Sequence, residues 1–127
     1  MAKRILIVDD EEYMLRFMHH HLVRAGYLTS TARNGLEAVA KATGEPPDLV
    51  ILDLMMAEMD GLTALKELKR ADITREIPVI VITANAHAVT RQDSESAGAA
   101  GFFTKPFSPT LLLVEIKRLL TEAVSAG

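Results

Sequence analysis

Four apolar runs recur along the chain, and each stops at a polar residue able to take part in chemistry. The runs cover residues 5–8, 49–52, 79–82 and, more briefly, 102–104, and they are followed by Asp9 and Asp10, by Asp53, by Thr83 and by Lys105. Continuous aliphatic runs of this length, without alternation, predict strands that are buried on both faces. Such strands are typical of a parallel sheet.

Stretches with helical spacing separate the apolar runs. Residues 12–25 place apolar side chains on one predicted helix face, and Gly26 provides a stop; these side chains are Met14, Leu15, Met18, Leu22 and Val23. Residues 28–32 alternate weakly and predict a more exposed edge strand. A second helix is expected to open at Asn34 and Gly35, and a third, marked by Leu62, Leu65 and Leu68, after Asp60 and Gly61.

The last two predicted helices differ in quality. Residues 88–97 are mostly polar, so a helix there should dock weakly and move easily. The final helix has a clear start, because Ser108 is a good N-cap and Pro109 suits the first helical position. Its buried stripe comprises Leu112, Ile116, Leu119 and Leu120, while Leu111 or Leu113 should stay partly exposed.

The order is strand then helix, repeated five times. Because crossovers between parallel strands are right-handed, the helices should cover both faces of the sheet. The predicted fold is therefore a doubly wound α/β domain, (βα)5. We expect one domain over residues 1–127, with 121–127 as a tail or linker.

Composition narrows the class of protein. The chain has 127 residues, no cysteine and a formal net charge of −3. One ordinary core is expected, without disulfides, and the charge argues against direct nucleic-acid binding. The apolar run after Lys3 and Arg4 is too short for a signal peptide or a membrane span, so we expect a cytoplasmic protein.

In an open parallel sheet, ligands bind at the carboxyl ends of the strands. The residues that follow the runs should therefore meet at one edge: Asp9, Asp10, Asp53, Thr83 and Lys105. Three carboxylates, a hydroxyl and an ammonium group suit a divalent cation and a phosphoryl group, and Mg2+ in particular combines few carboxylates with phosphate oxygens. A cation and Lys105 would offset the repulsion among the carboxylates and keep Asp53 ionised.

Over essentially its whole length the chain resembles the receiver domain of bacterial two-component response regulators, including single-domain chemotaxis regulators. The segments that carry the resemblance are Ile7–Glu11, Ala32–Ala38, Asp53–Gly61, Ile82–Ala84 and Gly98–Phe107. The resemblance implies a flavodoxin-like sheet in the order 2-1-3-4-5. It also implies a signalling domain that catalyses only its own aspartyl phosphorylation and dephosphorylation.

The resemblance implies a role for each matching residue. Asp53 would accept the phosphoryl group, and Mg2+ would be held by Asp10, Asp53, the main-chain carbonyl of Met55 and, through water, Asp9. The phosphoryl group would be bound by Thr83, Ala84 and Lys105, with Ala84 small enough to leave the path of attack open. Thr83 and Phe102 would form the switch, and the Lys105–Pro106 peptide bond would be cis.

Two residues depart from the pattern of the family. Ala57 stands where proline is usual, which bears on the rigidity of the loop after Asp53. Phe102 lacks the hydroxyl of the tyrosine found in many relatives. The expected partners are a sensor histidine kinase or a histidine phosphotransfer protein, and a downstream protein or output domain that the sequence does not identify. Homodimerisation through the fourth helix, fifth strand and fifth helix is a further expectation.

Three other functions compete with the receiver interpretation. A haloacid-dehalogenase-type phosphatase would need a second aspartate two residues after Asp53, where Met55 stands. A flavodoxin-like nucleotide module would need a phosphate loop after the first strand, where Asp9–Glu12 would repel a phosphate. A degenerate receiver, acting as an interaction module without phosphorylation, is the remaining alternative.

Several of these residues also have plain structural interpretations. Asp9 and Asp10 would favour the start of the first helix, and Asp60 is expected to cap the third. The triplet His19–His21 does not form a metal site, since successive helical side chains point about 100° apart. Only the joint pattern at the strand ends favours chemistry over these interpretations.

Overall fold

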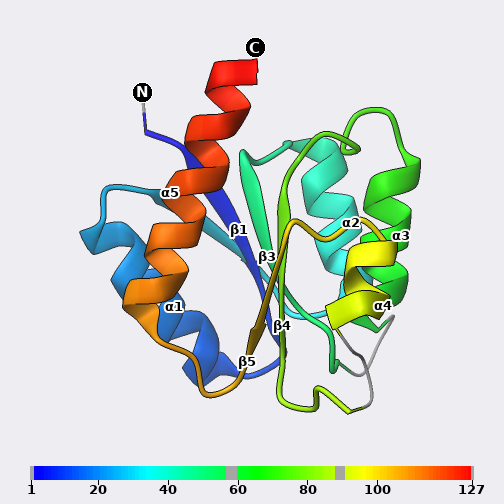
Figure 1. Ribbon diagram of the computed structural model, residues 1–127, viewed down its shortest axis with the longest axis horizontal. Coiled ribbons are helices and arrows are strands. Elements are labelled where there is room, and N and C mark those ends of the chain that lie inside the picture. The colour runs from blue at the N-terminus through cyan, green and yellow to red at the C-terminus, as the bar shows by residue number, and fades with distance from the viewer. Residues whose placement is uncertain (1, 57–59, 88–90, 127) are drawn as a thin grey trace.

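The computed structural model describes residues 2–56, 60–87 and 91–126, with side chains up to Thr121. Strands and helices alternate along the chain (Figure 1): β1 Arg4–Val8, α1 Glu12–Arg24, β2 Leu28–Ala32, α2 Gly35–Gly44, β3 Leu49–Asp53, α3 Gly61–Arg70, β4 Val79–Thr83, α4 Arg91–Ser96, β5 Gly101–Thr104 and α5 Pro109–Ala126. Five strands pair in parallel in the order β2-β1-β3-β4-β5. The predicted fold class and strand order are confirmed.

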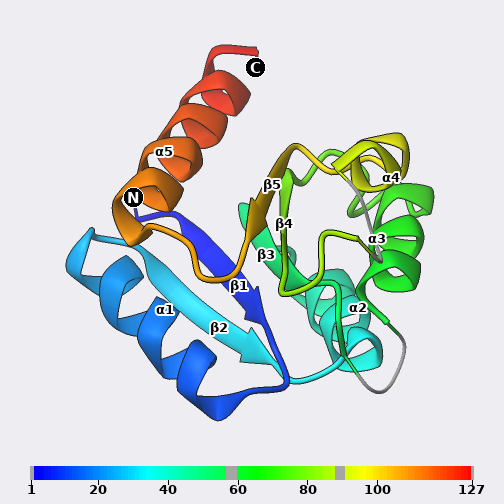
Figure 2. The ribbon, with the colours of Figure 1, turned by 60° about the horizontal axis from the view of Figure 1, so that its bottom comes forward.

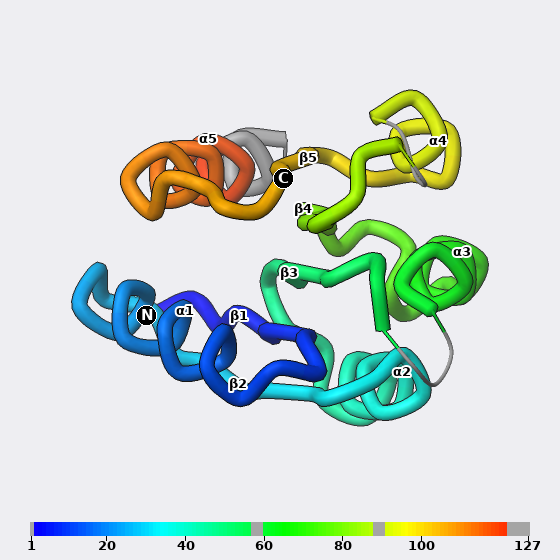
Figure 3. The backbone as a smooth tube through the Cα atoms, turned by 90° about the horizontal axis from the view of Figure 1, so that it is seen from below, coloured from blue at the N-terminus to red at the C-terminus, as the bar shows by residue number. Residues whose placement is uncertain are grey.

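The helices form a layer on each face of the sheet. Helices α1 and α5 lie on one face, and α2, α3 and α4 lie on the other (Figures 1 and 3). Figure 2 shows the same division from a second direction. Alternate residues of each central strand point to opposite layers, so the sheet contributes to two separate cores.

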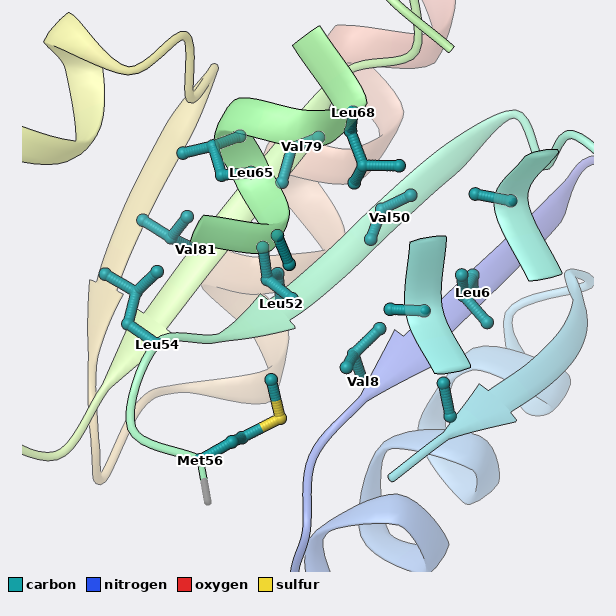
Figure 4. Close-up of a cluster of buried hydrophobic side chains, with 14 residues drawn as sticks. Leu6, Val8, Val50, Leu52, Leu54, Met56, Leu65, Leu68, Val79 and Val81 are labelled. Atoms are coloured by element: carbon teal, nitrogen blue, oxygen red, sulfur yellow. The ribbon is translucent and has the colours of Figure 1, made fainter. Parts of the chain in front are cut away.

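The first core lies beneath α2 and α3. Figure 4 shows the strand residues Leu6, Val8, Val50 and Leu52 directed toward the same cluster as Leu65 of α3. The second core lies beneath α1 and α5 and contains most of their predicted buried residues, with Met14 partly buried and Val23 outside it. Burial on both faces explains the unbroken aliphatic runs of β1, β3 and β4. All residues of β3 and β4 are buried, and so are those of β1 from Ile5 to Val8.

Most predicted helix boundaries are confirmed by side-chain caps. Asn34 Oδ1 accepts a hydrogen bond from the Glu37 amide at 2.8 Å, and Asp60 Oδ1 accepts one from the Thr63 amide at 2.8 Å. The Ser108 hydroxyl accepts from the Leu111 amide at 3.2 Å. Gly26 has a φ of 96° just after α1, a left-handed conformation that favours glycine.

Some sequence expectations need correction. Val23 is 47% exposed rather than part of the buried face of α1, because it is turned about 100° around the helix axis from the buried Leu22. Residues 121–126 of the expected tail or linker are helical and continue α5. Helix α4 starts at Arg91 in the described chain, and the part of its prediction that covers residues 88–90 lies outside the described residues.

Among the helices of the described segments, none combines the length and apolarity that a membrane span requires.

Candidate functional site

The carboxyl ends of the strands bring the predicted residues to one edge of the sheet. Asp53 is the last residue of β3 and lies opposite Ile82 of β4 in the register. Asp9 directly follows β1, whose Val8 lies opposite Leu52. In Figure 3, which looks at the molecule from below, the segments that follow these strands face the viewer.

Asp9, Asp10 and Asp53 form a carboxylate cluster. Each offers a carboxylate oxygen, and the three oxygens lie within 4.8 Å of one another. Asp9 and Asp53 are buried, whereas Asp10 is exposed. Within the described part of the chain, only this cluster gathers three groups in an arrangement able to hold a metal ion. The spacing and the all-oxygen donors fit Mg2+, because it accepts a few carboxylates and retains waters for its other positions.

Lys105 joins the cluster from the segment after β5. Its Nζ lies 2.9 Å from Asp9 Oδ2, 3.3 Å from Glu11 Oε1 and 3.5 Å from Asp53 Oδ2. Its backbone amide donates to the Thr83 carbonyl at 2.9 Å, which anchors it beside β4. The Lys105–Pro106 peptide bond is cis, as the resemblance implies.

Backbone amides hold the two buried carboxylates in place. The Glu11 amide donates to Asp9 Oδ1 at 2.9 Å, and the Met55 amide donates to Asp53 Oδ1 at 3.0 Å. In each case one carboxylate oxygen is held by the backbone, while the other faces Lys105. The carboxylates are therefore held in one orientation before any ligand binds.

The surroundings of Asp53 have opposing effects on its pKa. Burial is the main cause that raises the pKa of Asp53, from 3.8 to about 6, and the neighbouring charge of Asp9 adds to it. The Met55 amide and the Lys105 ammonium act in the opposite direction. Burial alone would lower the pKa of Lys105, but Asp9, Asp53 and Glu11 outweigh it and the pKa is raised. A divalent cation among the carboxylates would offset the repulsion that remains.

The other predicted residues lie on or after the neighbouring strands, and among them Met55 contacts a carboxylate, through its backbone amide. Thr83 ends β4 and is fully buried, and its hydroxyl accepts from the Asn85 amide at 3.0 Å. Ala84 follows it and is exposed. The Met55 side chain is exposed while its amide is used by Asp53. Phe102 lies on β5, partly buried against the core under α2 and α3.

Two features of the site were missed by the sequence analysis. Glu11 forms an ion pair with Lys105. The sequence marked Glu11 only as part of the segment Ile7–Glu11, with no role of its own. Gly61 lies against β3: a Cβ there would be 2.3 Å from the Asp53 carbonyl oxygen. The sequence marked Gly61 only as the start of a helix. Ala57, the departure in the loop after Asp53, lies outside the described residues.

The geometry agrees with comparisons to known proteins. Residues 5–117 match the family of response regulator receiver domains. The chain is 41% identical over 121 residues to the chemotaxis protein CheY of Bacillus subtilis, with 94% of this chain and 99% of that protein covered. It is also 35% identical over 123 residues to the polar-differentiation response regulator DivK of Brucella anthropi, covering 97% of this chain and all of DivK.

Solved structures give the same result. A CheY-like response regulator receiver domain protein from Methanospirillum hungatei superimposes with a TM-score of 0.93 at 31% identity, covering both chains completely. The chain therefore belongs to the family of response regulator receiver domains, which are signalling domains of two-component systems.

Some relatives are much longer than this chain. It is 37% identical to the alkaline phosphatase synthesis transcriptional regulatory protein PhoP of Bacillus subtilis, but spans 52% of that protein. It spans 26% of the response regulator PleD of Caulobacter vibrioides. The chain thus corresponds to the whole of some regulators and to one portion of others.

Proposed function

We propose that this protein is a phosphoacceptor of a two-component system, in which Asp53 receives a phosphoryl group from a histidine kinase or a histidine phosphotransfer protein. The observation that carries the proposal is the convergence of Asp9, Asp10 and Asp53 with Lys105 at one edge of the sheet. A cytoplasmic location and one receiver domain over residues 1–127 are part of the proposal.

The proposed reaction is a displacement at phosphorus. A carboxylate oxygen of Asp53 attacks the phosphorus of a phosphohistidine; the new P–O bond forms as the P–N bond breaks, and the electron pair of that bond stays on the imidazole nitrogen. The product is a mixed anhydride on Asp53, which water later hydrolyses. Such transfer depends on placement and charge stabilisation more than on proton transfer, in keeping with a site built around a lysine.

The residues around Asp53 suit this task. Asp10, Asp53 and the Met55 carbonyl would hold Mg2+ directly, and Asp9 would hold it through water. Bound Mg2+ would neutralise charge on the transferred phosphoryl oxygens. Lys105, already 3.5 Å from Asp53, would pair with the phosphoryl group. Thr83 would donate its hydroxyl to that group, and the small side chain of Ala84 would leave the path of attack open.

The signal would then pass through Thr83 and Phe102. The Thr83 hydroxyl accepts from the Asn85 amide, so its hydrogen is available to donate to a phosphoryl group when the side chain moves toward that group. The space that it leaves would be filled by the Phe102 ring from the adjacent strand. Helix α4, which packs beside β5, would move with the ring because it has a poor apolar face.

We propose that downstream contacts form on the face of α4, β5 and α5, with a target protein or with a second copy of this chain. An open groove runs over β5 between these helices, and the exposed Leu111 and Val114 of α5 line it. Analytical ultracentrifugation with and without a phosphoryl analogue would distinguish the two: a concentration-dependent dimer only with the analogue supports self-association, and a monomer in both states supports a separate target.

Mass spectrometry tests the phosphoacceptor function. The protein is incubated with acetyl phosphate and Mg2+, and the intact mass is measured for the wild type, for Asp53→Ala and for Asp72→Asn as a control. Asp72 is an exposed aspartate paired with Arg75, away from the site. One phosphoryl group is expected on the wild type and the control, and none on Asp53→Ala or in the presence of EDTA. An unmodified wild type would contradict the proposal and favour a phosphorylation-independent interaction module.

A further inference from the structure

The first residue of α4 lies against the predicted switch ring. The guanidinium carbon of Arg91 is 5.2 Å from the centroid of the Phe102 ring on β5. An arginine over an aromatic face at this distance makes a cation–π interaction. Arg91 is exposed and Phe102 is partly buried, so the contact lies at the surface between α4 and the edge of the sheet.

The chain just after α4 packs against α3. At the carboxyl end of α4, Gly98 has a φ of 106°, and a Cβ there would lie 2.8 Å from Cγ of Lys69. The Lys69 stem is itself fixed, because its Nζ donates to the carbonyls of Arg75 and Ile77 at 3.0 and 2.6 Å. This end of α4 is therefore closely seated against α3.

The described part of α4 is linked to β5 at Arg91. Within Arg91–Ser96 only Ser94 is buried, and its hydroxyl donates to the Arg91 carbonyl inside the helix, at 2.9 Å. The Arg91 side chain, by contrast, reaches a different element, through the Phe102 ring. The cation–π contact is thus a link between the start of α4 and β5.

Phe102 depends on this contact more than a tyrosine would. The phenylalanine ring has no hydroxyl, so no hydrogen bond can fix it in an outer or an inner position. Its register places it opposite Val81, two residues before Thr83 on the neighbouring strand. The ring position is then set by packing against the core and by Arg91.

We propose that Arg91 is a positioning residue that holds the Phe102 ring in place through the cation–π contact and so favours the unphosphorylated conformation. This rests on the proposed phosphoacceptor function. When the ring turns toward Thr83, it leaves the guanidinium, and the energy of the contact opposes the change. A ligand shifts such an equilibrium only by its differential affinity for the two states, so a weaker contact makes the shift easier.

The effect can be expressed as a fold-change. An exposed cation–π contact corresponds to a factor of about two to five in an equilibrium constant. If the active conformation is the minor state, its population rises by that factor in Arg91→Ala. The apparent dissociation constant for a ligand that selects this state falls by the same factor.

The test uses beryllium fluoride with Mg2+ as an equilibrium analogue of the phosphoryl group, measured by isothermal titration calorimetry. Arg91→Ala and Arg91→Gln should bind it about two to five times more tightly than the wild type, whereas Arg91→Lys, which keeps a cation, should stay near the wild type. Arg70→Ala is the matched control, because Arg70 is an exposed arginine on α3 that pairs with Glu67. If the loss of positive charge alone mattered, Arg91→Ala and Arg70→Ala would both bind the anionic analogue more weakly than the wild type.

A second measurement separates positioning from a merely structural role. In a Phe102→Leu background, Arg91→Ala should no longer change the affinity, because the ring is gone. Amide exchange of α4 without any ligand should be about two to five times faster in Arg91→Ala than in the wild type. Equal affinity of Arg91→Ala and wild type, or an equal effect in both backgrounds, would overturn the positioning role.

The two proposals fail in different ways. If the wild type takes up phosphoryl groups but Arg91→Ala binds and exchanges like the wild type, the Arg91 proposal is overturned and the phosphoacceptor function stands. If no variant binds the analogue and none is phosphorylated, the proposed function is contradicted. In that case amide exchange still tests the Arg91 proposal: if α4 exchanges at the same rate in ligand-free Arg91→Ala and wild type, the positioning role of Arg91 is overturned as well.

Discussion

At the residue scale, the surroundings of Asp53 make its ionised form more costly in the folded protein than in the unfolded chain. Its side chain is buried, it lies beside Asp9, and its pKa is raised to about 6. The unfolded chain would ionise this carboxyl near its ordinary value of 3.8. Below that pH both states hold the proton and no cost arises; the cost grows as the pH rises from 3.8 to about 6, where only the unfolded chain is ionised, and is complete above about 6.

Asp53→Asn should therefore stabilise the metal-free protein at pH 7.5. The expected gain in the free energy of unfolding is about 1–3 kcal/mol there, falling toward zero at pH 4, because the amide carries no charge to bury. Urea unfolding in EDTA at the two pH values measures it. Asp72→Asn, on an exposed pair, should change little at either pH. A destabilised Asp53→Asn at pH 7.5 would contradict this account of the site.

Gly61 gives a second prediction at this scale. A Cβ at this residue would lie 2.4 Å from Leu54 Cα and 2.3 Å from the Asp53 carbonyl oxygen, both backbone atoms. Gly61→Ala should destabilise the fold by at least about 2 kcal/mol, since β3 and the start of α3 must separate. Gly44→Ala is the control, because nothing lies within 4 Å of a Cβ there. Equal thermal stability of the two variants would show that the close approach of Gly61 to β3 does not require a glycine.

The sequence could predict individual residues where the strand direction alone determines their position. Asp9, Asp53, Thr83 and Lys105 each end or follow a strand, so a parallel sheet places them at one edge. The ion pair between Glu11 and Lys105 depends on the path of the chain after β1, which apolar spacing does not encode.

At the element scale, α1 and α4 differ in what they bury. Helix α1 places Leu15, Met18 and Leu22 in the core, whereas Ser94 is the buried residue of Arg91–Ser96. Burial of apolar surface is the main contribution to helix stability in a protein. The sequence could predict this contrast from the polar composition of residues 88–97. Its apolar character alone places Val23 on the predicted buried face, although helix geometry turns it about 100° away from Leu22.

Hydrogen exchange checks the contrast between the two helices. The amides of α4 should exchange through local opening, with protection well below that of α1, because few buried contacts must break. The measurement is exchange at pH 7 in the unphosphorylated protein, compared residue by residue. Equal protection in the two helices would remove α4 as the moving element of the switch.

At the scale of the whole molecule, cation binding should be linked to folding. Mg2+ that binds the native cluster, and not the unfolded chain, stabilises the fold by about 2.7 kcal/mol at 100 times its dissociation constant. Asp10→Asn should remove most of this gain, because Asp10 contributes one of the three carboxylates. Unfolding with increasing Mg2+ at fixed ionic strength measures it, and equal gains in both proteins would contradict the predicted ligand set.

The central claim concerns the bond that forms on Asp53, and chemical trapping tests it most directly. After treatment with acetyl phosphate and Mg2+, borohydride reduces an acyl phosphate to an alcohol and converts the modified aspartate to homoserine, which peptide mass spectrometry locates. The account predicts homoserine at position 53 alone, and only when Mg2+ was present. Homoserine at another aspartate, or a phosphoryl group that survives borohydride on a hydroxyl side chain, would contradict it.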